Sequence, residues 1–147
     1  MPANPKKNER TILLADEDVI VRLVIAQYLR GCGLHVLEAA TSQEAKAILQ
    51  TLEPIDILLS DAQLAGAESG FALAQWVRRH RPGVEIMLHI SVTSKAAAAF
   101  ELCCPPGANK RSDLHSLTAK IEAMAAQRRR RARPQQSAKT ARRRKQS

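Results

Sequence analysis

The stretch Thr11-Ile-Leu-Leu-Ala-Asp-Glu-Asp18 decides the fold class. Its first five residues form a short, mostly apolar run, and three consecutive acids end that run abruptly. A run of this length is typical of a strand buried on both faces, as strands of parallel sheets are. From Val19 the apolar residues follow helical spacing until Gly31-Cys32-Gly33, which supplies a helix stop. The stretch therefore predicts a buried strand that leads directly into a helix.

The same alternation of strand and helix continues along the chain. Further strands are predicted at residues 34–39, 55–60 and 84–90, and further helices at 41–52, 71–80, 96–102 and 113–127. Thr41-Ser-Gln-Glu44 fits a capping box. Residues 103–109 should hold a fifth strand, which Pro105 and Pro106 make irregular. The pattern predicts an α/β fold, a doubly wound five-stranded parallel sheet with helices on both faces.

The positive charge of the chain is concentrated at its C-terminal end. The 147 residues carry 23 basic and 14 acidic side chains, a net charge of +9. Ten of the basic residues and none of the acids lie in residues 128–147, so the rest of the chain is close to neutral. We therefore predict a disordered N-terminus over residues 1–9, one domain over 10–127, and a basic, disordered tail over 128–147.

Several classes of protein are disfavoured by composition. No apolar run approaches the ~20 residues of a membrane span, and the polar N-terminus is unlike a signal peptide, so a cytoplasmic protein is expected. The three cysteines, Cys32, Cys103 and Cys104, are odd in number and include an adjacent pair. This arrangement predicts no disulfide framework and suits a reducing cytosol. The four histidines stand at no zinc-ligand spacing from these cysteines.

Acids follow two of the predicted strands. Asp16 and Glu17 end the first strand, and Asp61 ends the third. Ligands of open α/β sheets bind outside the carboxyl ends of the strands, where the strand order reverses. If these two strands are neighbours, three carboxylates converge, and Mg²⁺ would relieve their mutual repulsion. The alternative is that these acids are ordinary polar loop residues. Asp18 better fits a helix N-cap, and Arg22 a surface or helix-packing residue.

Three segments carry a family resemblance. Ile12-Leu-Leu-Ala-Asp-Glu-Asp-Val-Ile-Val-Arg22 resembles the opening of a response-regulator receiver domain. Ile57-Leu-Leu-Ser-Asp-Ala-Gln-Leu-Ala-Gly66 resembles the phosphoacceptor strand and loop of that family. Asn109-Lys110, followed by Asp113-Leu114 and Leu117, resembles its fifth-strand lysine and last helix. The resemblance covers about residues 10–126.

The resemblance implies a flavodoxin-like strand order of 2-1-3-4-5 and a role for each matching residue. Asp61 would accept a phosphoryl group, Asp16 and Glu17 would hold Mg²⁺ together with Asp61, and Lys110 would contact the phosphoryl oxygens. The implied donor is a histidine kinase or a phosphotransfer protein. Such a protein signals by contact and is not an enzyme in the ordinary sense.

The sequence departs from the family pattern where the signal is relayed. The family has a Ser or Thr at the end of strand four, which hydrogen-bonds the phosphoryl group. A direct alignment places Ile90 at this position. A shift of one residue places Ser91 there, which makes Ser91 the candidate switch hydroxyl. No role is assigned to His89. Lys110 is followed by Arg rather than Pro, residues 103–109 contain no aromatic, and Ala65 replaces the usual proline. These departures concern the output switch more than the phosphorylation chemistry.

The sequence therefore predicts a response regulator of a two-component phosphorelay, phosphorylated on Asp61. One alternative is a degenerate pseudo-receiver that acts as a phosphorylation-independent binding module. Another is non-specific nucleic-acid binding through the basic tail. Three further roles remain as alternatives for this tail: binding to an acidic protein, binding to an anionic membrane surface, or keeping the chain in solution. Because no aromatic interleaves the arginines, base stacking and sequence-specific recognition are not expected.

Overall fold

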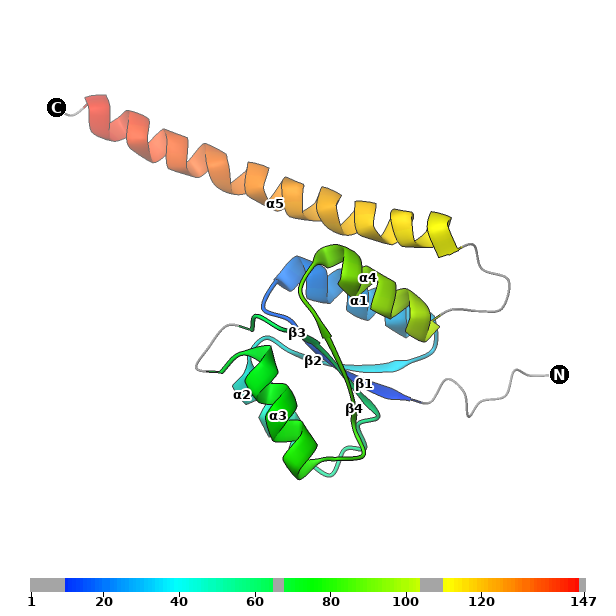
Figure 1. The fold of residues 1–147 in the computed structure, drawn as a ribbon. Helices are drawn as coiled ribbons and strands as arrows, with labels where there is room; N and C mark the ends of the chain where they lie inside the picture. Colours follow the sequence, from blue (N-terminus) through cyan, green and yellow to red (C-terminus); the bar gives the residue numbers. More distant parts are fainter. Residues whose placement is uncertain (1–9, 65–67, 104–109, 146–147) are drawn as a thin grey trace.

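A parallel sheet forms the centre of the molecule (Figure 1). The computed structural model describes residues 10–64, 68–103 and 110–145, with the backbone alone for 110–113 and 132–145. Within this part of the chain the strands are β1 (Thr11–Ala15), β2 (His35–Ala39), β3 (Ile57–Asp61) and β4 (Glu85–His89). Their order across the sheet is β2-β1-β3-β4. This order reverses between β1 and β3, as the family resemblance implied for the first four strands.

The two central strands are buried on both faces. Every residue of β1 and of β3 is buried, which explains their nearly continuous apolar sequences. The parallel register pairs Ala15 with both Ala39 and Ser60, so β1 and β3 end at the same edge. Asp61 in turn pairs with His89 of β4. The residues that follow β1 therefore lie beside the last residue of β3.

Helices cover both faces of the sheet. The helices α1 (Val19–Gly31), α4 (Val92–Cys103) and α5 (Lys110–Lys145) lie on one face, where α5 packs over α1 and α4 (Figure 1). The helices α2 (Ser42–Leu49) and α3 (Gly70–His80) cover the other face. Each face has its own aliphatic core, and Phe100 is the one aromatic among the largest fully buried side chains of the described residues. The helices thus enclose the centre of the sheet between two layers.

Side-chain caps define where three of the helices begin. Asp18 accepts hydrogen bonds from the N–H groups of Ile20 and Val21, which confirms it as the N-cap of α1. Thr41 accepts from the N–H of Glu44, while Glu44 accepts from the N–H of Ala40. The predicted capping box of α2 is therefore present in slightly shifted form. Ser69 caps α3 in the same way.

The structure differs from the prediction in its C-terminal third. The predicted fifth strand falls within residues 103–109, of which Cys103 ends α4 and residues 104–109 lie outside the described part. Helix α4 begins at Val92, four residues earlier than predicted, because Ser91 and Ser94 form a cap at that point. The last helix runs from Lys110 to Lys145, beyond the predicted end near Gln127. The division between domain and tail at residues 127 and 128 stays a prediction.

A disulfide joins Cys32 to Cys103, contrary to the prediction that the cysteines form none. The two Cα atoms are 5.6 Å apart, within the range that a disulfide spans. The residues are 71 positions apart in sequence, and an odd cysteine count excludes only complete pairing, so spacing alone did not reveal the bond. Across the described residues, no helix is long and apolar enough to cross a membrane.

Candidate functional site at the carboxyl edge of strands β1 and β3

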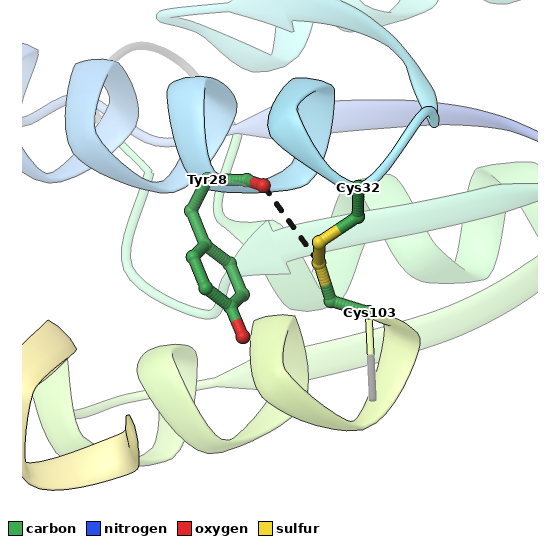
Figure 2. Close-up of a disulfide and its surroundings, with 3 residues drawn as sticks. All are labelled: Tyr28, Cys32 and Cys103. Atoms are coloured by element: carbon green, nitrogen blue, oxygen red, sulfur yellow. Dashed lines mark hydrogen bonds between the residues drawn. A yellow bond between two sulfur atoms is a disulfide. The ribbon is translucent and has the colours of Figure 1, made fainter. Parts of the chain in front are cut away.

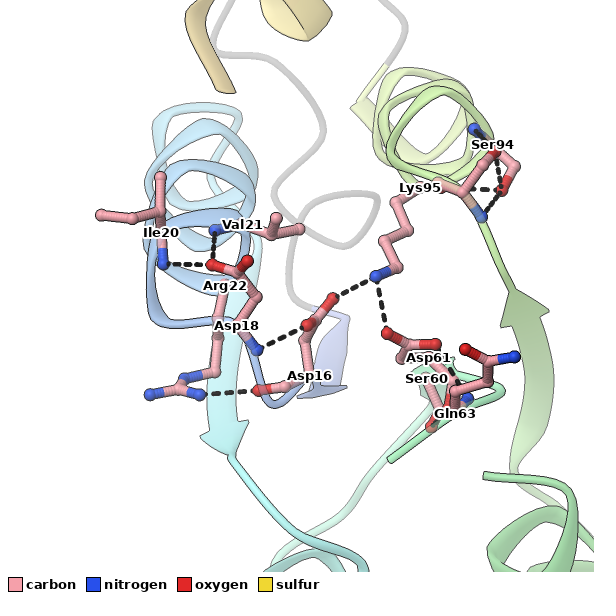
Figure 3. Close-up of polar contacts among 11 residues, drawn as sticks. Asp16, Asp18, Ile20, Val21, Arg22, Ser60, Asp61, Gln63, Ser94 and Lys95 are labelled. Atoms are coloured by element: carbon pink, nitrogen blue, oxygen red, sulfur yellow. Dashed lines mark hydrogen bonds and ion pairs between the residues drawn. The ribbon is translucent and has the colours of Figure 1, made fainter. Parts of the chain in front are cut away.

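The carboxylates of Asp16 and Asp61 meet at the point where the strand order reverses (Figure 3). Asp16 follows β1 directly and is 1% exposed, and Asp61 is the last residue of β3 and is 9% exposed. The N–H of Asp18 donates to Asp16 Oδ1 at 2.9 Å, and the N–H of Gln63 donates to Asp61 Oδ1 at 2.9 Å. Each carboxylate therefore has one oxygen fixed by the backbone of its own loop.

The other oxygen of each acid contacts Lys95, in the first turn of α4. Lys95 Nζ lies 2.8 Å from Asp16 Oδ2 and 2.7 Å from Asp61 Oδ2. The lysine side chain is only 9% exposed, so the three charges interact in a poorly solvated environment. With all three groups ionised, the cluster carries one net negative charge. Two buried acids are thus held by one ammonium group.

The surroundings shift the pKa of two members of this cluster. Burial raises the pKa of Asp16, and the hydrogen bonds from Lys95 and from the N–H of Asp18 offset this only in part. Burial alone would lower the pKa of Lys95, but its hydrogen bonds to Asp16 and Asp61 raise it overall. The ammonium form of Lys95 is therefore stabilised by the acids, and burial penalises the charged form of Asp16.

A hydrogen-bond network fixes the loop that carries Asp16. Arg22 Nη1 donates to the carbonyl oxygen of Asp16 at 2.6 Å, and Arg22 also pairs with Glu38. The N–H of Asp16 donates to the carbonyl oxygen of Ala39 at 3.0 Å. The helix-packing residue expected at position 22 thus also positions the acidic loop.

The donor set suits a hard divalent cation. The Oδ2 atoms of Asp16 and Asp61 converge on one ammonium, which shows that two oxygen donors can share a single cation at this point. Glu17, the third predicted ligand, is exposed beside them. Among the described residues, no group of three or more His, Cys, Asp or Glu side chains is arranged to hold a metal. In this arrangement Lys95 takes the position between the acids that a metal ion would need.

Of the remaining predicted site residues, Ser91 lies at the cap of α4, and the side chain of Lys110 lies outside the described residues. The hydroxyl oxygen of Ser91 accepts the N–H of Ser94 at 3.1 Å, and Ser94 Oγ accepts the N–H of Ser91 at 3.2 Å. Ser91 is therefore engaged at the start of α4 (Figure 3 shows Ser94 and Lys95 beside this cap). Lys110 is the first residue of α5, and its side chain lies outside the described part.

Lys95 was not identified from the sequence, although a physical signal was available. A lysine in the first turn of a helix opposes the helix dipole, and the residues that follow Lys95 are four alanines and a phenylalanine. A cation in such an apolar first turn requires an acidic partner. Because α4 directly follows β4, the acidic partner was to be expected at the carboxyl edge of the sheet.

The sequence and the fold were compared with known proteins. Residues 12–121 match the model of the response regulator receiver domain family. The match spans most of the chain, so this protein belongs to the response regulator receiver domain family. Receiver domains of this kind are the signalling modules of two-component systems.

Curated relatives are longer than this chain. The phosphate regulon transcriptional regulatory protein PhoB of Pseudomonas aeruginosa is 36% identical over 86 residues, which are 58% of this chain and 36% of PhoB. The transcriptional regulatory protein GltR of the same species is 31% identical over 78 residues, 50% of this chain and 30% of GltR. The aligned segments thus span about a third of these relatives.

A solved structure supports the fold. The chemotaxis response regulator CheY4 of Vibrio cholerae superposes with a TM-score of 0.52 at 20% identity, covering 77% of this chain and 99% of CheY4. At this level of identity the likeness concerns the fold alone. It agrees with the flavodoxin-like strand order seen here.

Proposed function

We propose that this protein is a phosphorelay response regulator that accepts a phosphoryl group on Asp61 from a histidine kinase or a phosphotransfer protein. The observation that carries the proposal is the convergence of Asp61, Asp16 and Lys95 at the switch point of the sheet. This edge is where ligands of open α/β sheets bind. The family membership supports the same reading.

Asp61 would act as the nucleophile. A carboxylate oxygen of Asp61 attacks the phosphorus of a phosphohistidine, the new P–O bond forms, and the P–N bond breaks, which returns the electron pair to the imidazole. The hydrogen bond from the N–H of Gln63 fixes Oδ1 and so orients the carboxylate. Lys95 Nζ, at 2.7 Å from Oδ2, is placed to contact an oxygen of the transferred group. Lys110 remains the second candidate for this contact.

Asp16, Glu17 and Asp61 would hold Mg²⁺ at this edge. When bound, the ion neutralises negative charge on the transferring phosphoryl group. The acids of this chain provide the oxygen donors, and the backbone N–H groups of Asp18 and Gln63 keep those donors in place. Lys95 has to give up at least one of its two ion pairs for the site to accept the ion.

Ser91 would report phosphorylation as the switch hydroxyl. Its O–H now donates to Ser94 Oγ at 3.1 Å, so donation to a phosphoryl oxygen requires this hydrogen bond at the cap of α4 to break. The N–H of Lys95 also donates to the carbonyl oxygen of Ser91 at 3.0 Å. Opening the cap would therefore loosen the helical turn that positions Lys95, which offers a route from phosphorylation to a change in α4.

Intact mass after incubation with a small phosphodonor and Mg²⁺ tests the proposal. The wild-type chain should gain one phosphoryl group, and the gain should require the metal. Asp61→Asn should gain none, whereas the exposed Glu53→Gln should behave as the wild type. A folded wild-type protein that gains no group from either a phosphodonor or a panel of phosphorylated kinases would refute phosphoryl acceptance.

A second candidate function is a phosphorylation-independent binding module. It is favoured by the fact that Lys95, a residue of the chain itself, already pairs with both acids at the position where a cation would bind. Such a module would keep the same fold and the same partner affinity in Asp61→Asn. Unchanged partner binding by this variant, measured before and after incubation with phosphodonor, would favour the module over the switch.

The basic tail is a separate candidate for polyanion binding. Arg128 to Arg131 are exposed on α5, and residues 128–147 contain no acid to offset them. Each phosphate contact releases counterions, so binding should weaken steeply with salt. Removal of residues 128–147 should abolish salt-sensitive retention on duplex DNA. Equal retention of the truncated and full-length chains would exclude this role.

A further inference from the structure

The disulfide connects the ends of two helices (Figure 2). Cys32 is the C-cap of α1, and Cys103 is the last residue of α4. The Sγ atom of Cys103 lies 3.7 Å from the carbonyl oxygen of Tyr28 on α1. The bond therefore fixes the C-terminal end of α4 to α1.

The other end of α4 is fixed to the candidate site. Lys95, in the first turn, pairs with Asp16 and Asp61. Cys103 lies eight positions after Lys95, about 12 Å along a helix at its usual rise. Between them the side chains of Ala96, Ala98, Ala99 and Phe100 are buried. Helix α4 is thus a short rigid element that is attached covalently at one end and by an ion-pair cluster at the other.

We propose that the Cys32–Cys103 pair is a reversible redox site whose disulfide clamps α4 and thereby holds Lys95 against the acids. The inference rests on the proposed function of Asp16 and Asp61 as a cation and phosphoryl site. In the oxidised form, withdrawal of Lys95 requires α4 to move against the covalent bond. In the reduced form α4 is attached only by non-covalent contacts, and Lys95 leaves the acids more readily.

Thiol–disulfide exchange with a small disulfide forms the bond. The thiolate of one cysteine attacks a sulfur of the small disulfide, giving a mixed disulfide and one small thiol. The second protein thiolate attacks the mixed disulfide, which forms the Cys32–Cys103 bond and expels the second small thiol. The two protein sulfurs are oxidised together while the small disulfide is reduced to two thiols. An excess of the small thiol drives the same steps in reverse.

A cavity gives small thiols a route to the bond. A cavity of about 530 Å³ lies between α1, α4 and α5 and is lined in part by Cys32, Tyr28, Phe100 and Lys120. Neither cysteine of the pair is fully buried. The exposed ammonium of Lys120 favours an anionic thiol or disulfide, and the volume suits a short peptide. We therefore expect small anionic peptide disulfides to be the oxidants of this pair.

Calorimetric titration with Mg²⁺ tests the redox clamp. One sample of the chain is treated with oxidised glutathione, which forms the disulfide, and the other with a phosphine, which reduces it. The reduced chain should bind Mg²⁺ about tenfold more tightly, a usual size for coupling between linked sites. Cys32→Ser should bind like the reduced chain under both conditions. Cys104→Ser is the matched control and should retain the redox difference.

Lys95→Met separates failure of the clamp from failure of the site. This variant should bind Mg²⁺ tightly and equally in both redox states, since no ammonium remains to be displaced. Equal affinity of the oxidised and reduced wild-type chains, with Mg²⁺ binding intact in Lys95→Met, would overturn the clamp and leave the site standing. Loss of Mg²⁺ binding in every folded variant, Cys32→Ser included, would overturn the cation site and the clamp with it.

Discussion

Gly70, the first residue of α3, lies directly against the backbone of Asp61. A Cβ atom at position 70 would overlap the carbonyl oxygen of Asp61 and would stand 2.9 Å from the Cα of Ala62. The N–H of Gly70 donates to the carbonyl oxygen of Ala62 at 3.0 Å. Absence of a side chain at this position thus allows α3 to close onto the end of β3 and sets the position of Asp61.

Substitution of Gly70 by alanine should therefore displace the end of β3. We expect Gly70→Ala to lower the free energy of unfolding by about 2–3 kcal/mol, since the clash is with backbone atoms that cannot rotate away. Phosphorylation of Asp61 should fall as well. Denaturant unfolding measures the first effect. Gly31→Ala is the control, because nothing lies within 4 Å of its added Cβ, and a similar loss in both variants would contradict this explanation.

Removal of the Lys95 ammonium should destabilise the protein in the absence of metal. Lys95→Met leaves Asp16 and Asp61 buried without a counterion, which typically costs about 3–5 kcal/mol. Excess Mg²⁺ should restore much of the loss, because the ion binds the same carboxylates. Urea unfolding with and without Mg²⁺ is the measurement. Lys120→Met, at an exposed position, should change stability little in either condition.

A double-mutant cycle tests whether the lysine and the acid act as one unit. The second substitution, Asp16→Asn, removes the acid whose pKa burial raises. In the double variant Lys95→Met with Asp16→Asn, only one uncompensated carboxylate remains. We expect it to be more stable than Lys95→Met alone, which gives a clear coupling energy. Strict additivity of the two single effects would show that the ion pair contributes nothing.

His89 should make the stability depend on pH. Burial lowers the pKa of His89 from its ordinary value of 6.5, and the charge of Lys95 adds to this while Glu101 opposes it. Its Nε2 atom is buried without a hydrogen-bond partner in the described part of the chain. The unfolded chain therefore binds more protons than the folded protein once the pH falls below about 6.5, so stability decreases there.

The His89 contribution can be isolated by substitution. The free energy of unfolding of the wild type should decrease as the pH falls from neutral to below 6.5. In His89→Gln this decrease should be smaller. His115→Gln, at an exposed site on α5, should leave the pH profile unchanged. Chemical denaturation at a series of pH values measures both. Identical profiles for His89→Gln and the wild type would exclude His89 as the titrating group.

Reduction of the disulfide should lower global stability even if function is unaffected. The bond closes a long loop between residues 32 and 103, and loss of such a bond typically costs about 2–4 kcal/mol. The melting temperature of the oxidised chain should exceed that of the reduced chain, whereas Cys32→Ser should show no such difference. A disulfide-dependent melting temperature in Cys32→Ser would point to pairing by another cysteine.

The N-terminal half of the fold could be predicted because its signals are local. The apolar runs of β1 and β3 end at acids, and the caps at Asp18 and Thr41 depend on residues two to four positions away. The strand order was implied by the family resemblance alone, and the switch-point rule then located the ligand site within that order. These features need no knowledge of long-range contacts. The positions of Asp16 and Asp61 beside each other were inferred on the same basis, and the structure brings them together.

The contacts made by α4 could not be predicted because they are long-range. Lys95 meets Asp61 across 34 residues, and Cys103 meets Cys32 across 71. Their sequence neighbours give no direct sign of either partner. The sequence instead pointed to Lys110, whose side chain lies outside the described part, and to Ser91, whose oxygen caps α4. The role of each of these two residues in phosphoryl transfer stays a prediction.

The distribution of the charge cluster over β1, β3 and α4 also bears on how the chain assembles during synthesis. Residues 10–89, which supply the four strands of the described part of the chain, leave the ribosome before α4 is complete. At that stage Asp16 and Asp61 face each other at the sheet edge without their ammonium partner, and their repulsion opposes the pairing of β1 with β3. Arrival of Lys95 removes this opposition. The nascent sheet should therefore become resistant to proteolysis only once α4 has emerged, which makes α4 the element that allows β1 and β3 to pair stably.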